Sequence, residues 1–322
     1  MARYIGQRVI QLFIVLFVVT FLVAIALRFL PGGADVVVAL KTGPGATPEQ
    51  AAEIKHELYL DRSIPEQYAL WLKDLVTLDW GTTFQTNQPI REELGRAFPV
   101  SIRLMIYAQL LALGFAIPMG MWSAYKQGTG ADRAATTTAF GLLAMPEYIV
   151  APLLIYLFAL RFRWFDYPAS NISFFDDPLE HFKAFVLPTL TIALPLYATY
   201  MRLLRADLVA TLQSDFITTA RAKGLSTKRI LFGHALRPSL FSLVTAAAVS
   251  TGALIGGVVI VEQVFQLNGM GRVSVESIFR REYPTVQYGV VILALVYVFV
   301  NFFVDLAYAW IDPRVRHARM LG

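Results

Sequence analysis

Long apolar runs constrain this chain more than any other feature of its sequence. A helix needs about 20 mostly apolar residues to cross the roughly 30 Å hydrocarbon core of a bilayer. Of the 322 residues, 56% are hydrophobic, and most of that excess is gathered into long segments. We therefore predict an all-α integral membrane protein with six transmembrane helices, at Val9 to Leu30, Pro99 to Tyr125, Ala134 to Leu160, Phe185 to Leu204, Ser239 to Val261, and Val286 to Ile311.

The first run has the flanks of a cleaved signal peptide, since Arg3 and Arg8 precede it. Its apolar stretch of about 22 residues is longer than the core of such a peptide, and no small-residue cleavage site ends it. We interpret it as a retained first span.

The distribution of basic residues predicts the orientation, because membrane proteins carry an excess of lysine and arginine in their cytoplasmic loops. With the N-terminus inside, the cytoplasmic segments hold far more basic than acidic residues, whereas acidic residues prevail in the outer segments. We therefore place both termini in the cytoplasm. The formal charge of +5 follows from this asymmetry and suits anionic lipid, so it does not require nucleic acid.

The polar segments divide the chain into three parts. Residues 1–98 comprise the first transmembrane helix and an extracytoplasmic insert. Residues 99–311 form a five-helix domain that includes a cytoplasmic loop at 205–238, and residues 312–322 form a cytoplasmic tail.

Two helices are expected in the insert, from about Pro48 to Leu60 with Thr47 as its cap and from about Pro65 to Leu78. The insert is rich in acidic residues. They form either a solvated face or a lip that contacts an extracytoplasmic partner.

A basic segment, SDFITTARAKGLSTKRILFGHALRP, lies between the fourth and fifth runs, from Ser214 to Pro238. The Ser214 hydroxyl is expected to cap a helix, and Gly224 stands where helices prefer a left-handed residue. A helix of about nine residues is marginal in water by itself. We therefore expect it to dock on another surface through the apolar stripe of Phe216, Ile217 and Ala220.

Several kinds of chemistry are excluded. Cysteine is absent, so disulfides, thiolate metal ligands and thiol catalysis are excluded. The chain lacks a GxxxxGK[ST] phosphate-binding loop, an HExxH motif and a GxSxG elbow, and its four histidines fall in different segments. We predict that the chain is not an enzyme and holds neither a metal nor a cofactor.

Polar residues inside the apolar runs are candidates for a translocation path. Glu147 lies near the middle of the third run, directly after Pro146. Because an ionisable group is costly at that depth, it is either functional or hydrogen-bonded to a neighbouring helix. Gln109 and Asn301 are further candidates, although such amides more often join helices.

Five motifs resemble permeases of ABC importers, in particular the dipeptide, oligopeptide and nickel branch. TTARAKGL followed by HALRPSL resembles the cytoplasmic signature loop, with Thr218 and Thr219 in place of its Glu and first Ala. In VEQVFQLNGMGR, Asn268 replaces the usual Pro, and in REYPTVQ, Glu282 replaces the usual Asp. The similarity extends over the whole chain and favours the DppB/OppB type; the remaining matches are VEQVFQLNGMGR, REYPTVQ, LDWGTTFQTNQPI and IDPRVR.

This resemblance implies a type I ABC importer permease fold that forms half of a translocation pathway in a bacterial cytoplasmic (inner) membrane. It implies a second, DppC/OppC-like permease, two cytoplasmic DppD/DppF-like ATPases that bind ATP and Mg, and an extracytoplasmic substrate-binding protein. The segment around Asp215 would be a coupling helix seated in a groove of one ATPase. The expected coupling residues are Asp215, Phe216, Ile217, Thr219, Ala220, Arg221, Lys223 and Gly224.

Peptides are the cargo that the resemblance favours, and nickel, glutathione and sugars are the alternatives within the branch. Two other functions are weighed against it. One is a secondary transporter that works alone, with Glu147 as its cation site. The other is nucleic-acid binding by the basic loop, which the position of the loop between two membrane spans makes improbable.

Overall fold

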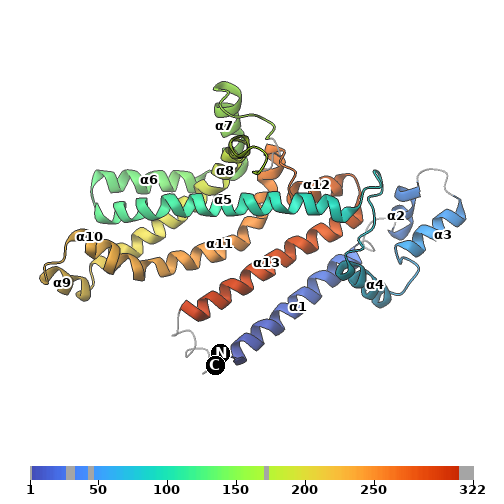
Figure 1. Ribbon diagram of the computed structural model, residues 1–322, viewed down its shortest axis with the longest axis horizontal. Coiled ribbons are helices and arrows are strands. Elements are labelled where there is room, and N and C mark those ends of the chain that lie inside the picture. Colours follow the sequence, from blue (N-terminus) through green and yellow to red (C-terminus); the bar gives the residue numbers. More distant parts are fainter. Residues whose placement is uncertain (1, 27–32, 43–46, 170–173, 312–322) are drawn as a thin grey trace. The chain divides into compact units, whose positions relative to one another are not determined.

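The computed structural model describes residues 2–26, 33–42, 47–169 and 174–311 (Figure 1). Within these ranges every regular element is a helix, and none is a β-strand, which confirms the predicted all-α class. The chain divides into two compact units, residues 1–100 with 268–322 and residues 101–267. The predicted boundary at residue 98 lies next to this division, whereas the last helix belongs with the N-terminal part. The predicted tail lies outside the described residues.

The unit of residues 101–267 is a helical bundle with α8 at its centre. Helix α8 packs against α6, α7 and α11, and it buries Ile192, Leu204 and Leu208 completely. Short helices follow α8 and lead into α11 (Figure 1). Its elements are α5 (Ile90–Tyr125) from residue 101 onward, α6 (Gly130–Ala144), α7 (Glu147–Leu154), the π-helix η2 (Ile155–Arg161), α8 (Pro178–Leu212), α9 (Asp215–Ala222), α10 (Thr227–Arg229), the π-helix η3 (Ile230–Ala235) and α11 (Leu236–Phe265).

The predicted third span is broken rather than continuous. Helix α6 and the α7–η2 pair meet at an angle of 101° (Figure 1). Met145 is extended, with φ −95° and ψ 111°, and Pro146 precedes the first residue of α7. Proline disfavours the helical region for the residue before it and has no N–H to donate, so the helix ends here and restarts.

The other unit joins the polar insert to the first and last helices. Helix α13 packs against α1 and α12, and α1 packs against α4. Six aromatic rings form a chain of contacts across these elements, and Trp71 and Trp80 both stack on Tyr288. The elements are α1 (Ala2–Ala26), α2 (Gly33–Thr42), α3 (Pro48–Glu57), α4 (Ile64–Thr77), α12 (Met270–Phe279) and α13 (Tyr283–Ile311), and the other rings are Phe17, Phe21 and Tyr68.

The two helices expected in the insert are confirmed, and α2 is an additional helix that the sequence did not predict. Thr47 caps α3, since its hydroxyl accepts from the Gln50 N–H at 3.3 Å. At the start of α4, the Glu66 carboxylate accepts from both the hydroxyl and the N–H of Ser63. These hydrogen bonds hold the pKa of Glu66 below its usual value.

Among the described residues, four helices are long and apolar enough to cross a membrane, or five if the bent α6 and α7–η2 pair is one span. The chain is therefore a multi-pass membrane protein. The apolar part of α1 extends only over Val9–Ile25, which is shorter than the other spans. The count of six stays a prediction.

Candidate functional site

Helix α9 is short, and its C-terminal end has a defined geometry. The N–H of Gly224 donates to the carbonyl of Arg221 at 2.9 Å, and the N–H of Leu225 donates to that of Ala220 at 3.3 Å. This pair of bonds is a Schellman motif, which needs a left-handed residue. Gly224 has φ +76°, as its position in the sequence predicted.

The predicted cap at the other end of α9 is wrong. Ser214 occupies the N-cap position, but its side chain accepts no hydrogen bond from the helix. Its hydroxyl donates instead to the Thr211 carbonyl at 2.5 Å. The serine hydroxyl thus provides a hydrogen-bond donor to a carbonyl at the end of α8 and no acceptor to the N–H groups at the start of α9. The conformation of the turn between the two helices decides which of these bonds forms.

Two of the three residues of the apolar stripe of α9 are buried within the chain itself, and this corrects the expected groove contact for them. Ile217 is fully buried and Ala220 is only 7% exposed, and α9 packs against η3. Neither side chain is therefore available to an ATPase. Phe216, which is 51% exposed, remains accessible.

The outward surface of α9 is mixed in character. Residues on the side opposite Ile217 and Ala220 are all exposed, as their helical spacing requires. In the part of the chain that the structure describes, none of the charged groups on α9 or directly after it forms an ion pair. The exposed coupling residues are Asp215, Phe216, Thr219, Arg221, Lys223 and Gly224.

A buried ion pair, which no local sequence pattern indicates, joins α5, α6 and α8. Arg205 donates from Nε and Nη2 to the two carboxylate oxygens of Asp132, at 2.6 and 2.7 Å. Those oxygens also accept from the Ser123 hydroxyl at 2.6 Å and from the Gly128 N–H at 2.9 Å. Asp132 is 3% exposed, so the carboxylate is satisfied by four donors out of water.

Of the three predicted path residues, Gln109 is committed to joining helices. Its Nε2 donates to the Ala247 carbonyl of α11 at 3.2 Å, and its Oε1 accepts from the Tyr200 hydroxyl of α8 at 3.1 Å. Both ends of the amide thus have partners within the unit. The interhelical alternative is the one that the structure favours.

The structure does not bring the three path residues together as one group. Asn301 belongs to the unit of α1 and α13 and donates from Nδ2 to the Tyr297 carbonyl of its own helix at 2.8 Å. Glu147 belongs to the other unit, where it is the first residue of α7 and half-buried.

The Glu147 carboxylate lies directly against α11. A methyl group added to Gly257 would lie 2.9 Å from Oε2 and 3.2 Å from Oε1 of Glu147. The glycine therefore leaves the space that the carboxylate fills. Among the described residues, no lysine, arginine or histidine forms an ion pair with Glu147.

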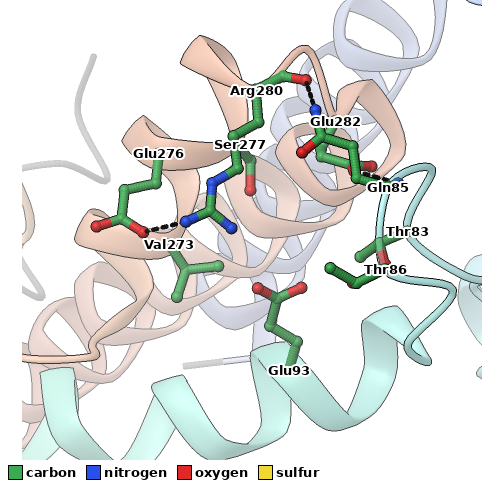
Figure 2. A pocket seen from close by; sticks show the side chains of 9 residues that line it. All are labelled: Thr83, Gln85, Thr86, Glu93, Val273, Glu276, Ser277, Arg280 and Glu282. Atoms are coloured by element: carbon green, nitrogen blue, oxygen red, sulfur yellow. Dashed lines mark hydrogen bonds and ion pairs between the residues drawn. The ribbon is translucent and has the colours of Figure 1, made fainter. Parts of the chain in front are cut away.

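A second buried carboxylate joins two of the family-like motifs. The Glu282 carboxylate of REYPTVQ accepts from the N–H groups of Phe84 at 2.6 Å and Gln85 at 2.8 Å, in LDWGTTFQTNQPI. The Gln85 side chain in turn donates to the Arg280 carbonyl at 3.0 Å (Figure 2). Glu282 is 4% exposed, so this contact is internal. The two motifs were the only signal in the sequence for this contact, and they lie almost 200 residues apart.

A polar pocket of about 20 Å³ opens beside this junction. Figure 2 shows the Glu93 carboxylate pointing into it from α5. Its volume suits about one water molecule. The pocket is lined by Thr83, Gln85, Thr86, Glu93, Val273, Glu276, Ser277, Arg280 and Glu282.

Replacing Glu282 with alanine is expected to open the junction between the loop of residues 84–88 and α13. Hydrogen bonds to a charged group contribute about 1.5–3 kcal/mol each, so the loss of two is expected to cost roughly 3–6 kcal/mol in the stability of this junction. Faster protease cleavage within residues 84–88 in the membrane-embedded protein would show it. Glu92, which is exposed on α5 in the same unit and pairs with Arg96 at 3.0 Å, provides the control. Equal cleavage of the Glu282→Ala and Glu92→Ala variants would contradict the assignment.

Comparison with known proteins shows what this chain resembles. Residues 116–317 match the family described as binding-protein-dependent transport system inner membrane component, and residues 1–105 match the N-terminal family of the same transport systems. A probable peptide ABC transporter permease of Sinorhizobium fredii is 33% identical over 319 residues, which cover 98% of this chain and 100% of that protein. The dipeptide permease DppB of Alkalihalophilus pseudofirmus is 31% identical, and the glutathione permease GsiC of Escherichia coli K12 is 29% identical, each over 98% of this chain and 100% of its own length.

Proposed function

Because this chain belongs to the family of binding-protein-dependent transport system inner membrane components, we propose that it is a permease subunit of an ATP-driven peptide importer. The observation that carries the proposal is the family match, which begins at residue 116 and continues to residue 317. Two of the relatives have names that specify peptide or dipeptide transport. The subunit itself is a transport component and not an enzyme.

Members of this family work with ATPase and binding-protein partners. We propose that this chain pairs with a second, DppC/OppC-like permease, and that two DppD/DppF-like ATPases bind the ATP and Mg. The protein would lie in the bacterial cytoplasmic membrane with both termini inside. An extracytoplasmic binding protein would then deliver the peptide to the side that carries α3 and α4.

We propose that α9 transmits the movement of the ATPases to the membrane helices. Its support comes from two features: α9 follows directly on α8, and its buried side is packed on η3, which leads into α11. A displacement of α9 is thereby passed to two long helices at once. The contact surface would be Phe216 together with Asp215, Thr219, Arg221, Lys223 and Gly224, which are exposed.

Reconstitution tests this function. Proteoliposomes that contain both permeases and both ATPases are expected to accumulate a labelled dipeptide only when ATP and the binding protein are present. Vesicles with this chain alone, supplied with a proton or sodium gradient, are expected to accumulate none. Gradient-driven uptake by this chain alone would instead establish a secondary transporter.

A further inference from the structure

Glu147 is an acidic residue in an apolar setting for which the proposed transport cycle has no assigned use. Glu147 follows the break between α6 and α7 and is the first residue of α7, a helix of eight residues. The first four N–H groups of a helix have no partner within it, and this end favours a negative charge. Glu147 lies near the middle of an apolar run, where an ionisable group is costly and is retained where it meets a cationic partner or a water-filled path.

Gly257 leaves the space that the Glu147 carboxylate occupies. With oxygen atoms 2.9 and 3.2 Å from where a Cβ would stand, no larger residue fits at position 257 unless the carboxylate moves. The neighbouring Gly256 has no atom within 4 Å of the same position, so its side of α11 is open. Of the two adjacent glycines, only Gly257 lies against Glu147.

The described part of the chain provides no cation that pairs with Glu147. A peptide with a free amino terminus provides one, because its α-amino group is an ammonium at neutral pH whatever its side chains. We infer that the Glu147 carboxylate, in the space that Gly257 leaves, binds the amino-terminal ammonium group of the peptide during its passage. This inference rests on the proposed function, and it names the part of the cargo that the permease recognises.

The inference is tested in the reconstituted complex by combining a change in the protein with a change in the cargo. The two cargoes are a labelled dipeptide and its des-amino analogue, each at a concentration that saturates the binding protein by calorimetry. Glu147→Gln is expected to lower the uptake efficiency for the dipeptide by about 10- to 100-fold, the range that corresponds to a charge-assisted hydrogen bond. Uptake of the des-amino analogue is expected to change less than about twofold. Because the binding protein is the same throughout, its own preference cancels in the ratio.

Substitutions at Gly257 and Gly256 test the position of the Glu147 carboxylate while its charge is kept. In Gly257→Ala the added methyl group displaces the end of a flexible side chain, which costs the fold little. A displacement of about 1 Å can lower a rate by up to about 100-fold, and we expect dipeptide uptake to fall roughly 3- to 30-fold. Gly256→Ala has the same change in helix propensity and is expected to transport normally.

The outcomes separate the inference from the function on which it rests. If Glu147→Gln lowers uptake of the two cargoes equally, or if Gly257→Ala and Gly256→Ala behave alike, ammonium recognition at Glu147 is wrong and the importer function stands. If the wild-type complex hydrolyses ATP yet accumulates neither cargo, the peptide-import function itself is wrong.

Discussion

Replacing Phe216 with glutamate is expected to abolish ATP-driven peptide uptake while the amount of protein in the membrane stays the same. Phe216 is 51% exposed on α9, whereas Ile217 and Ala220 of the same helix are buried within the chain. An exposed aromatic residue is the kind of side chain that anchors an interface, and its loss costs about 2 kcal/mol or more, which corresponds to roughly 30-fold or more in binding. A buried, unpaired carboxylate in its place adds a desolvation cost.

The measurement is dipeptide uptake by proteoliposomes, together with the ATPase activity that the loaded binding protein stimulates. Both are expected to fall in Phe216→Glu. Gln127→Glu is the matched control, since Gln127 is exposed in the turn between α5 and α6 and the change in charge is the same. Uptake that survives Phe216→Glu would mean that α9 does not dock through this residue.

Replacing Asp132 with alanine is expected to destabilise the unit of residues 101–267 more than any surface substitution. The variant leaves the Arg205 guanidinium, whose side chain is 24% exposed, without its carboxylate partner. It also removes the acceptor for the Ser123 hydroxyl and the Gly128 N–H. Removing one partner of a buried ion pair costs about 3–5 kcal/mol of stability. For a chain of this size we expect the melting temperature to fall by roughly 10 °C.

Thermal melting of the purified chain in one detergent checks this result. Arg133→Ala is the control, because Arg133 is the exposed neighbour of Asp132 and surface changes usually stay within about 0.5 kcal/mol. Arg205→Lys keeps the charge but loses the two-pronged geometry, so an intermediate melting temperature is expected. A melting temperature for Asp132→Ala equal to that of Arg133→Ala would show that the pair contributes nothing to stability.

The correction at α9 shows why a correct local pattern predicted the wrong contact. Ile217 and Ala220 lie at helical spacing and are apolar, so their burial was foreseeable. Which surface buries them is a different question, because a stripe carries no information about its partner. Here η3 of the same chain covers them, and the exposed flank at Phe216 is left for another subunit.

In the third apolar run, too, the local sequence indicates where the helix is interrupted but not how the two parts pack. Proline after Met145 disfavours the helical region at that residue, so an interruption of the helix is foreseeable there. The bend of 101° depends on how α7 packs against α8 and α11, and no property of the run itself encodes that packing.

The sequence alone determined the helical class, the multi-pass character, the Thr47 cap in the insert, the left-handed glycine after α9 and the family. Each of these depends on composition or on neighbours within a few turns, where spacing and backbone preference decide the outcome. Only the tertiary structure paired Asp132 with Arg205, Glu282 with the loop at residues 84 and 85, and Glu147 with Gly257. Those pairs join residues 73, 198 and 110 positions apart, and contacts over such separations arise from helix packing rather than from any local pattern.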